Sequence, residues 1–255
     1  MRTDYSKLRY LVYTNKKLNG NFDLINRLIR DDKVVISEIK DNFSAFEMLE
    51  EENFASFLFA LGFVTLEKYR AAIKLKIPNQ TIKKIVADFM HYAFKDMDFN
   101  LHLQHFNNYL ADFGYEKDLQ VFHYLNEQTD SQSVIRDYID GEGFIKGFLT
   151  AYLSLNPYYE VKTEKEVTKG FVDILLNPIK DEIVYGAVIE IKYIPKNKFD
   201  DNLLKEKIED AKEQLDRYNI SKVKNLQKKE FVKIILVYKA WELVYCEEYK
   251  ISQVK

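Results

Sequence analysis

Asp173, Glu190 and Lys192 are charged residues inside two otherwise apolar runs, GFVDILL and GAVIEIKYI. Side chains alternate along a strand, so Glu190 and Lys192 point to the same face. The run around Asp173 is apolar on both faces, which is typical of a central, buried strand. A lone carboxylate in such a strand is destabilising unless another group compensates its charge.

A hairpin between the two runs would bring their carboxylates together. Folding the chain about residues 180–181, after a turn signal, places Asp173 within direct or diagonal reach of Glu190. The two like charges would repel each other, and a divalent cation with oxygen ligands would neutralise both. Lys192 could then orient a water molecule or stabilise charge that builds up on a phosphate.

Each of these three residues also has a simpler interpretation. Glu190 and Lys192 could meet water on the exposed face of an antiparallel strand. Asp173 could instead form a buried ion pair with Lys192 or occupy a bulge. The order of the surrounding elements bears on the choice between these interpretations.

The elements after Pro157 alternate between strand and helix. Together with the helix that precedes them, they give the order helix, three strands, helix and two strands, which predicts an α/β core in which helices cover a mixed sheet. The elements expected in this core are a helix within 133–155, strands at 158–167, 170–178 and 182–194, a helix over 201–218, and strands at 231–238 and 241–249.

The earlier part of the chain has mostly helical spacing of its apolar residues, from about residue 20 onward. Asn79 or Thr81 is a candidate N-cap of one of its helices, and Gly62 is a candidate helix stop. We therefore expect an all-helical scaffold over residues 1–130, followed by the α/β domain over residues 131–255.

Composition limits the classes of protein that fit. The chain of 255 residues is 47% hydrophobic with a net charge of −2, so it should bury a substantial core. Cys246 is its only cysteine, which excludes an internal disulfide framework and a cysteine-rich zinc site and fits a reducing, cytoplasmic compartment. The polar N-terminus predicts no signal peptide, and no apolar run is long enough to span a membrane.

The pattern of an Asp on one strand and Glu-x-Lys on the next resembles the signature of the PD-(D/E)XK nuclease superfamily. The element order is similar to the restriction-endonuclease-like core that this superfamily shares. The resemblance implies hydrolysis of phosphodiester bonds in nucleic acid, with DNA as the expected substrate and Mg²⁺ or Mn²⁺ as the cofactor. By the resemblance, Lys192 would position the attacking water and counter the charge on the phosphate.

The resemblance extends to further residues. Glu142 lies on the helix before the first core strand, where many of these nucleases carry an acidic residue, although it could simply favour the start of its helix. Gln214 and Tyr218 match the Gln-x-x-x-Tyr pattern of RecB-like members and would support the site, or they could be an ordinary packed pair. The expected metal ligands are Asp173, Glu190, the backbone carbonyl of Ile191, and Glu142.

A narrower resemblance links the chain to one bacterial branch, whose members often carry an AAA-ATPase-like domain ahead of the nuclease. The segments NFASFLFALGFVTLE, LKIPNQTIKKIV and KTEKEVTKGFVDILL are similar to that branch. No Gly-x-x-x-x-Gly-Lys-[Ser/Thr] occurs in this sequence, so we expect no nucleotide hydrolysis by this chain. The chain could be a fragment of a longer ATPase-fused protein, a naturally short member, or a partner of such a domain. Thr168 stands where the branch usually has Gly, and Phe171 stands where it usually has Arg. The loss of this basic residue could weaken contacts to phosphate.

Two functions from different classes therefore remain open. The first is a metal-dependent nuclease acting on DNA, and the second is a catalytically silent nuclease fold that binds nucleic acid or a protein partner. Lysine runs at residues 192–198 and 222–229 could contact phosphates in either case, or could simply be solvated surface. Neither function involves a membrane, and no residue indicates the oligomeric state.

Overall fold

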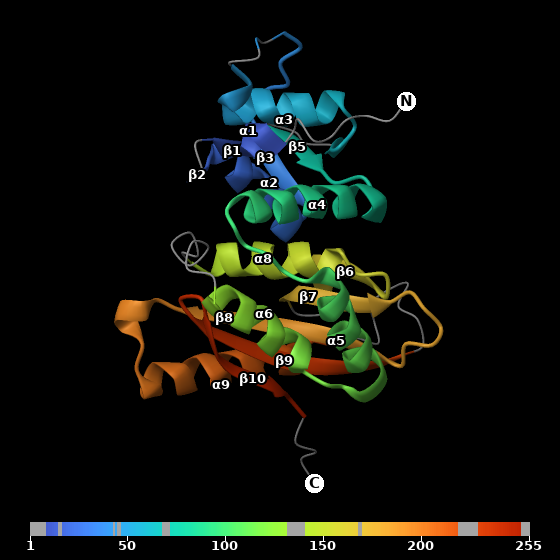
Figure 1. Ribbon diagram of the computed structural model, residues 1–255, viewed down its shortest axis with the longest axis vertical. Coiled ribbons are helices and arrows are strands. Elements are labelled where there is room, and N and C mark those ends of the chain that lie inside the picture. The colour runs from blue at the N-terminus through green and yellow to red at the C-terminus, as the bar shows by residue number, and fades with distance from the viewer. Residues whose placement is uncertain are drawn as a thin grey trace. The chain divides into compact units, whose positions relative to one another are not determined.

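The computed structural model describes residues 9–14, 17–42, 44, 47–67, 72–131, 141–167, 170–218 and 229–250. These residues belong to two compact units (Figure 1). Unit 1 consists of Met1–Asp98 and Gly147–Leu155, and unit 2 consists of Phe99–Lys146 and Asn156–Lys255. The predicted boundary near residue 130 stays a prediction.

Unit 1 combines helices with short strands. Its aromatic core includes Phe22, Phe94, Phe148 and Tyr152, with ring centroids 5.4 Å apart for Phe22 and Phe94 and 4.9 Å apart for Phe148 and Tyr152. Its elements are α1 (Arg9–Val12), β1 (Tyr13–Thr14), β2 (Lys17–Leu18), α2 (Gly20–Asp31), β3 (Lys33–Ile36), η2 (Glu47–Leu49), α3 (Glu51–Ala60), β4 (Thr65–Glu67), β5 (Ile73–Lys76) and α4 (Gln80–Asp96).

The first part of the chain is not all-helical, so this expectation needs correction. Strands β3, β5 and β4 form an antiparallel sheet in that order. These strands have only three or four residues, which is too short for a period-2 pattern to be distinguished from helical spacing. The helix signals were correct, because Asn79 caps α4 by accepting from the Ile82 amide and Gly62 adopts a φ of 77° after α3.

Unit 2 contains the predicted α/β core, which the structure confirms. A sheet of five strands has the order β10-β9-β8-β7-β6, antiparallel except for the parallel pair β8 and β9. The parallel pair is joined through α9, the crossover helix that such pairs require. The elements are α5 (Leu103–Glu116), α6 (Gln120–Ser131), α8 (Glu142–Ser154, whose residues from Gly147 belong to unit 1), β6 (Tyr159–Val167), β7 (Gly170–Pro178), β8 (Tyr185–Ile194), η3 (Lys196–Lys198), α9 (Asp201–Arg217), β9 (Glu230–Lys239) and β10 (Glu242–Glu248).

Helix α9 covers the sheet face on which β8 carries its even-numbered residues. Asp200 caps the helix by accepting from the backbone amides of Asn202 and Leu203. The apolar side of the helix, including Ala211 and Leu215, packs with Val188, Ile235 and Val237 of the sheet. Figure 1 shows α9 alongside the strands, and Gln214 in its last turn contacts Lys192 of β8.

Helices α5 and α6 also contact the sheet, at β8 and β10 respectively. Gly114 of α5 approaches so closely that a Cβ there would lie 2.6 Å from the Tyr159 hydroxyl and 2.9 Å from Ile183. Asn126 of α6 accepts a hydrogen bond from the Leu243 amide at 2.7 Å. The odd-numbered residues of β8, such as Ile189 and Ile191, are fully buried too, so β8 is covered on both faces.

Candidate active site

The hairpin of β7 and β8 brings Asp173 and Glu190 together. Its ladder pairs Ile174 with Ile189, so the next position places Asp173 opposite Glu190. Regular pairing stops there, and the Ile191 amide donates to Oδ2 of Asp173 at 2.8 Å instead of to the backbone of β7. The carboxylate of Asp173 therefore replaces a missing ladder acceptor while it lies buried beside a second carboxylate.

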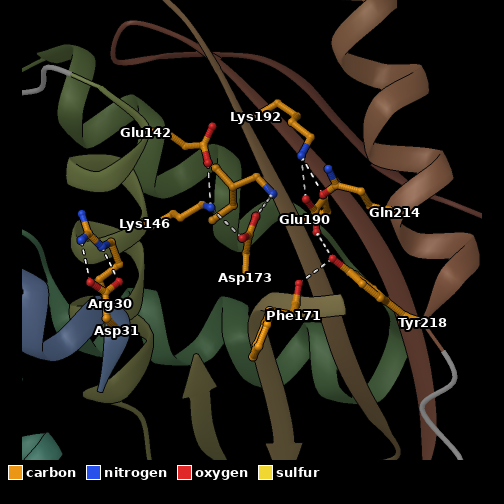
Figure 2. Close-up of polar contacts among 11 residues, drawn as sticks. Arg30, Asp31, Glu142, Lys146, Phe171, Asp173, Glu190, Lys192, Gln214 and Tyr218 are labelled. Carbon is orange, nitrogen blue, oxygen red and sulfur yellow. Dashed lines mark hydrogen bonds and ion pairs between the residues drawn. The ribbon is translucent and has the colours of Figure 1, made fainter. Parts of the chain in front are cut away.

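Lys192 contacts Glu190 on the same face of β8, as the strand period predicts. Its Nζ lies 2.7 Å from Oε1 of Glu190 and donates to Oε1 of Gln214 at 2.9 Å (Figure 2). The lysine is thus held between a strand and the last turn of α9. It does not pair with Asp173, so the alternative of a buried Asp173–Lys192 ion pair is wrong.

Tyr218 connects the end of α9 to both strands of the hairpin. It is the C-cap of the helix, where the backbone becomes extended. Its hydroxyl lies 3.1 Å from Oε2 of Glu190 and 2.6 Å from the carbonyl oxygen of Phe171. Gln214 and Tyr218 are four residues apart, which lets both side chains reach Glu190 and its partner Lys192 from a single helix end.

Glu142 reaches the site through a residue that sequence reasoning missed. Lys146, one turn further along α8, has its Nζ 2.7 Å from Oε1 of Glu142 and 2.7 Å from Oδ1 of Asp173. Figure 2 shows this ammonium between the two carboxylates. The available signal was the spacing Glu-x-x-x-Lys, which places both side chains on one helical face, but nothing local distinguishes it from an ordinary surface pair.

Burial and mutual repulsion make the two strand carboxylates reluctant to ionise together. Burial, followed by the negative charge of Asp173, raises the pKa of Glu190 to about 7, against the opposing effect of Lys192. Burial also raises the pKa of Asp173, although Lys146 and the Ile191 amide favour its ionised form. Burial lowers the pKa of Lys146, but the charges and hydrogen bonds of Asp173 and Glu142 together outweigh burial and raise this pKa. The site holds more negative charge than its lysines fully compensate.

Thr168 and Phe171, both upstream of Asp173, are the two positions expected to differ from the bacterial branch. The side chain of Phe171 is 55% exposed, so an apolar ring lies at the surface where a basic residue was expected. Thr168 lies outside the described residues, as do Lys222, Lys224 and Lys228 of the second lysine run. In the first run, Lys196 and Lys198 are exposed on η3.

Residues 140–248 match the family model described as the PD-(D/E)XK nuclease superfamily. Over these residues the chain is similar to members of this superfamily. The match contains all of the predicted site residues and Lys146. No curated protein and no solved structure shows a significant match to the chain. The link to an ATPase-fused branch stays a prediction.

Members of the PD-(D/E)XK superfamily generally hydrolyse phosphodiester bonds and typically use divalent metals, which bears on the predicted ligand set. The described residues contain no cluster of three or more Asp, Glu, His or Cys side chains that already has a metal-binding arrangement. They do offer two carboxylates on adjacent strands. The carbonyl of Ile191 should face the same side, since the N–H and C=O of a strand residue point in one direction and its amide meets Asp173.

These donors are hard oxygen ligands at a point of excess negative charge, which fits Mg²⁺ or Mn²⁺. Glu142 is engaged by Lys146 and would need to turn from it to join directly. In the part of the chain that the structure describes, no helix has the length and apolar character needed to cross a bilayer.

Proposed function

We propose that the chain is a metal-dependent nuclease that hydrolyses phosphodiester bonds in DNA. The observation that carries this proposal is the convergence of Asp173 and Glu190 on neighbouring strands, with Lys192 held 2.7 Å from Glu190. A buried pair of like charges destabilises a fold, so its presence in a superfamily domain of nucleases favours a functional role over a structural one.

Asp173, Glu190 and the Ile191 carbonyl would hold Mg²⁺ or Mn²⁺, with Glu142 assisting. A divalent ion there would act as a Lewis acid toward a phosphate oxygen. Lys192 would hold the attacking water in line and place its positive charge beside the phosphate as negative charge develops there. Gln214 fixes the Lys192 ammonium, and Tyr218 fixes the opposite oxygen of Glu190, so both act by positioning.

Exposed lysines on η3, which follows the site strand β8, support a nucleic-acid substrate. Lys196 and Lys198 follow directly after β8, and the Nζ of Lys196 lies 5.0 Å from the centre of the Trp241 ring. Such groups could contact the DNA backbone without reading its sequence. DNA rather than RNA is part of the proposal, as are the choice of metal ion and a reducing, cytoplasmic location for a chain whose single cysteine is free.

The rival function is a catalytically silent nuclease fold that binds nucleic acid or a protein partner. One observation favours it, because Asp173 and Glu190 each already have a lysine partner in this structure. A binding module, however, has no use for two buried carboxylates that repel each other.

Cleavage assays with the full chain separate the two functions. Linear and single-stranded DNA would be incubated with Mg²⁺, Mn²⁺ or EDTA, and the products resolved on denaturing gels. We expect cleavage by the wild type with either metal and none in EDTA. Lys192→Ala should lower the rate by about 10²-fold or more, the scale for losing a preorganised charge, while calorimetry shows metal binding intact.

Lys212→Ala is the matched control, because Lys212 of α9 pairs with the exposed Glu209 and not with a residue of the site. Its cleavage rate should equal that of the wild type. A wild type that binds DNA equally well in EDTA and never cuts it would decide for the silent module.

A further inference from the structure

Lys146 lies where two candidate metal ligands meet. Its Nζ is 2.7 Å from Oε1 of Glu142 and 2.7 Å from Oδ1 of Asp173. The second oxygen of Asp173 accepts from the Ile191 amide at 2.8 Å, so both oxygens of this carboxylate are engaged. The ammonium is therefore a cation held by two carboxylates of the candidate active site.

A divalent ion that bound these same two oxygens would be excluded by the Lys146 ammonium. Metal–oxygen bonds of about 2.0–2.3 Å would place the ion close to the present position of Nζ, where the two cations would overlap and repel each other. Lys192 does not present this conflict at Asp173, because it contacts Glu190 and Gln214. Among the residues that the structure describes, Lys146 is the one that stands between the carboxylate of Asp173 and that of Glu142.

We propose that Lys146 is an internal counter-ion that holds Glu142 and Asp173 in the metal-free protein and leaves this position when a divalent cation binds. The inference rests on the proposed function, since it needs the metal. Lys146 is then a positioning residue: it keeps two buried or partly buried carboxylates in place without metal, and it lowers the affinity for metal because it must be displaced.

A purely structural ion pair would behave differently on removal. Loss of a structural lysine would disorder the carboxylates and leave metal affinity unchanged or weaker. Loss of a competing cation leaves the same carboxylates with more uncompensated negative charge, so metal affinity rises. The sign of the change in metal affinity therefore separates the two roles.

The test is a calorimetric titration of the full chain with Mn²⁺, without nucleic acid. We expect Lys146→Met to bind Mn²⁺ at least about 5-fold more tightly than the wild type, the lower end of typical coupling between two sites. Lys146→Arg, which keeps the charge, should bind no more tightly than the wild type. In EDTA, Lys146→Met should melt at a lower temperature than the wild type and gain more from added Mn²⁺.

Lys162→Met is the matched control. Lys162 also forms a 2.7 Å ion pair, with Glu160 on β6, and its side chain is 21% exposed compared with 16% for Lys146. Its substitution should leave Mn²⁺ affinity unchanged. If Lys146→Met does not fold, Lys146→Gln serves in its place, because its amide can still donate to one carboxylate while it carries no charge.

The outcomes separate this inference from the proposed function. Suppose that the wild type binds Mn²⁺, that Asp173→Asn abolishes this binding, and that neither Lys146→Met nor Lys146→Gln binds Mn²⁺ more tightly. This result overturns the role of Lys146 and leaves the proposed function standing. No Mn²⁺ binding by the wild type or by the Lys146 variants overturns both proposals. Tighter binding in both Lys146→Met and Lys162→Met would show a general charge effect and would also overturn the specific role.

Discussion

Each unit of the molecule has a buried or partly buried lysine in contact with an aspartate, but the two environments differ in their balance of charge. In unit 1, Lys83 is 2% exposed and lies 2.6 Å from Asp32, whose side chain is 41% exposed. In unit 2, Lys146 and Lys192 contact Asp173 and Glu190, which are both buried and repel each other. The partner of Lys83 in unit 1 is a carboxylate that water also stabilises. In unit 2, by contrast, two carboxylates lie together, buried away from water.

This difference teaches that a buried charge by itself does not indicate a functional site. Asp32 is the C-cap of α2 with a φ of 55°, so its position is explained by the end of a helix and the start of β3. Nothing in the turn chemistry of β7 or β8 requires Asp173 or Glu190. Their convergence destabilises the metal-free fold, and we infer that metal binding and catalysis account for it.

The largest effect should come from removing one aspartate charge in each unit. Asp173→Asn should abolish Mn²⁺ binding and lower the rate of DNA cleavage by about 10³-fold or more. The substitution removes a charged metal ligand and, with the metal, the electrostatic stabilisation of the transition state. Asp32→Asn should leave Mn²⁺ binding and cleavage unchanged. Calorimetry would measure Mn²⁺ binding and gel assays would measure cleavage for the two variants side by side. If Asp32→Asn lost as much metal binding and cleavage as Asp173→Asn, the two units would not differ in function.

A smaller effect, on stability alone, is expected from the lysine of unit 1. Lys83→Met should lower the free energy of unfolding by about 1–3 kcal/mol, because it breaks a partly buried pair but leaves Asp32 access to water. Urea unfolding followed by circular dichroism would measure the loss. Mn²⁺ affinity should stay at the wild-type value, and a parallel change in metal affinity would contradict a purely structural role.

The smallest effect concerns the pH dependence of stability in EDTA. The pKa of Glu190 is about 7 in the folded chain against 4.5 when unperturbed, so the folded state binds more protons between these values. Wild-type stability should therefore fall as pH rises through this window and stay lower above it. Glu190→Gln cannot ionise, so at pH 8 it should be more stable than the wild type by about 1–2 kcal/mol, with little gain at pH 4.5.

Thermal unfolding at pH 4.5 and pH 8 measures this prediction, and Glu160→Gln on β6 is the control. Glu160 is paired with Lys162 at 2.7 Å and lies outside the carboxylate pair. Its substitution should produce no comparable gain at pH 8. A Glu190→Gln variant that is equally stabilised at both pH values would show that packing, rather than the charge on Glu190, causes the gain.

Sequence alone determined the α/β core and named most of the residues proposed for the site, because these depend on local patterns. Alternation of apolar residues placed β7 and β8, and a turn signal between them predicted Asp173 within direct or diagonal reach of Glu190, which the observed register puts opposite it. The period of two put Lys192 beside Glu190, and the helical period put Gln214 and Tyr218 at one end of α9. The family match over residues 140–248 agrees with these local signals.

Tertiary structure alone decided which charges pair. Lys146 contacts Asp173 across 27 positions of chain, and its i,i+4 spacing from Glu142 looks like any solvated helix pair until α8 is placed beside β7. The hydroxyl of Tyr218 reaches Phe171 only because α9 packs across the sheet. The short strands of unit 1 also depend on partners distant in sequence. Periodicity reports which face a residue occupies, whereas ion pairs depend on which faces meet.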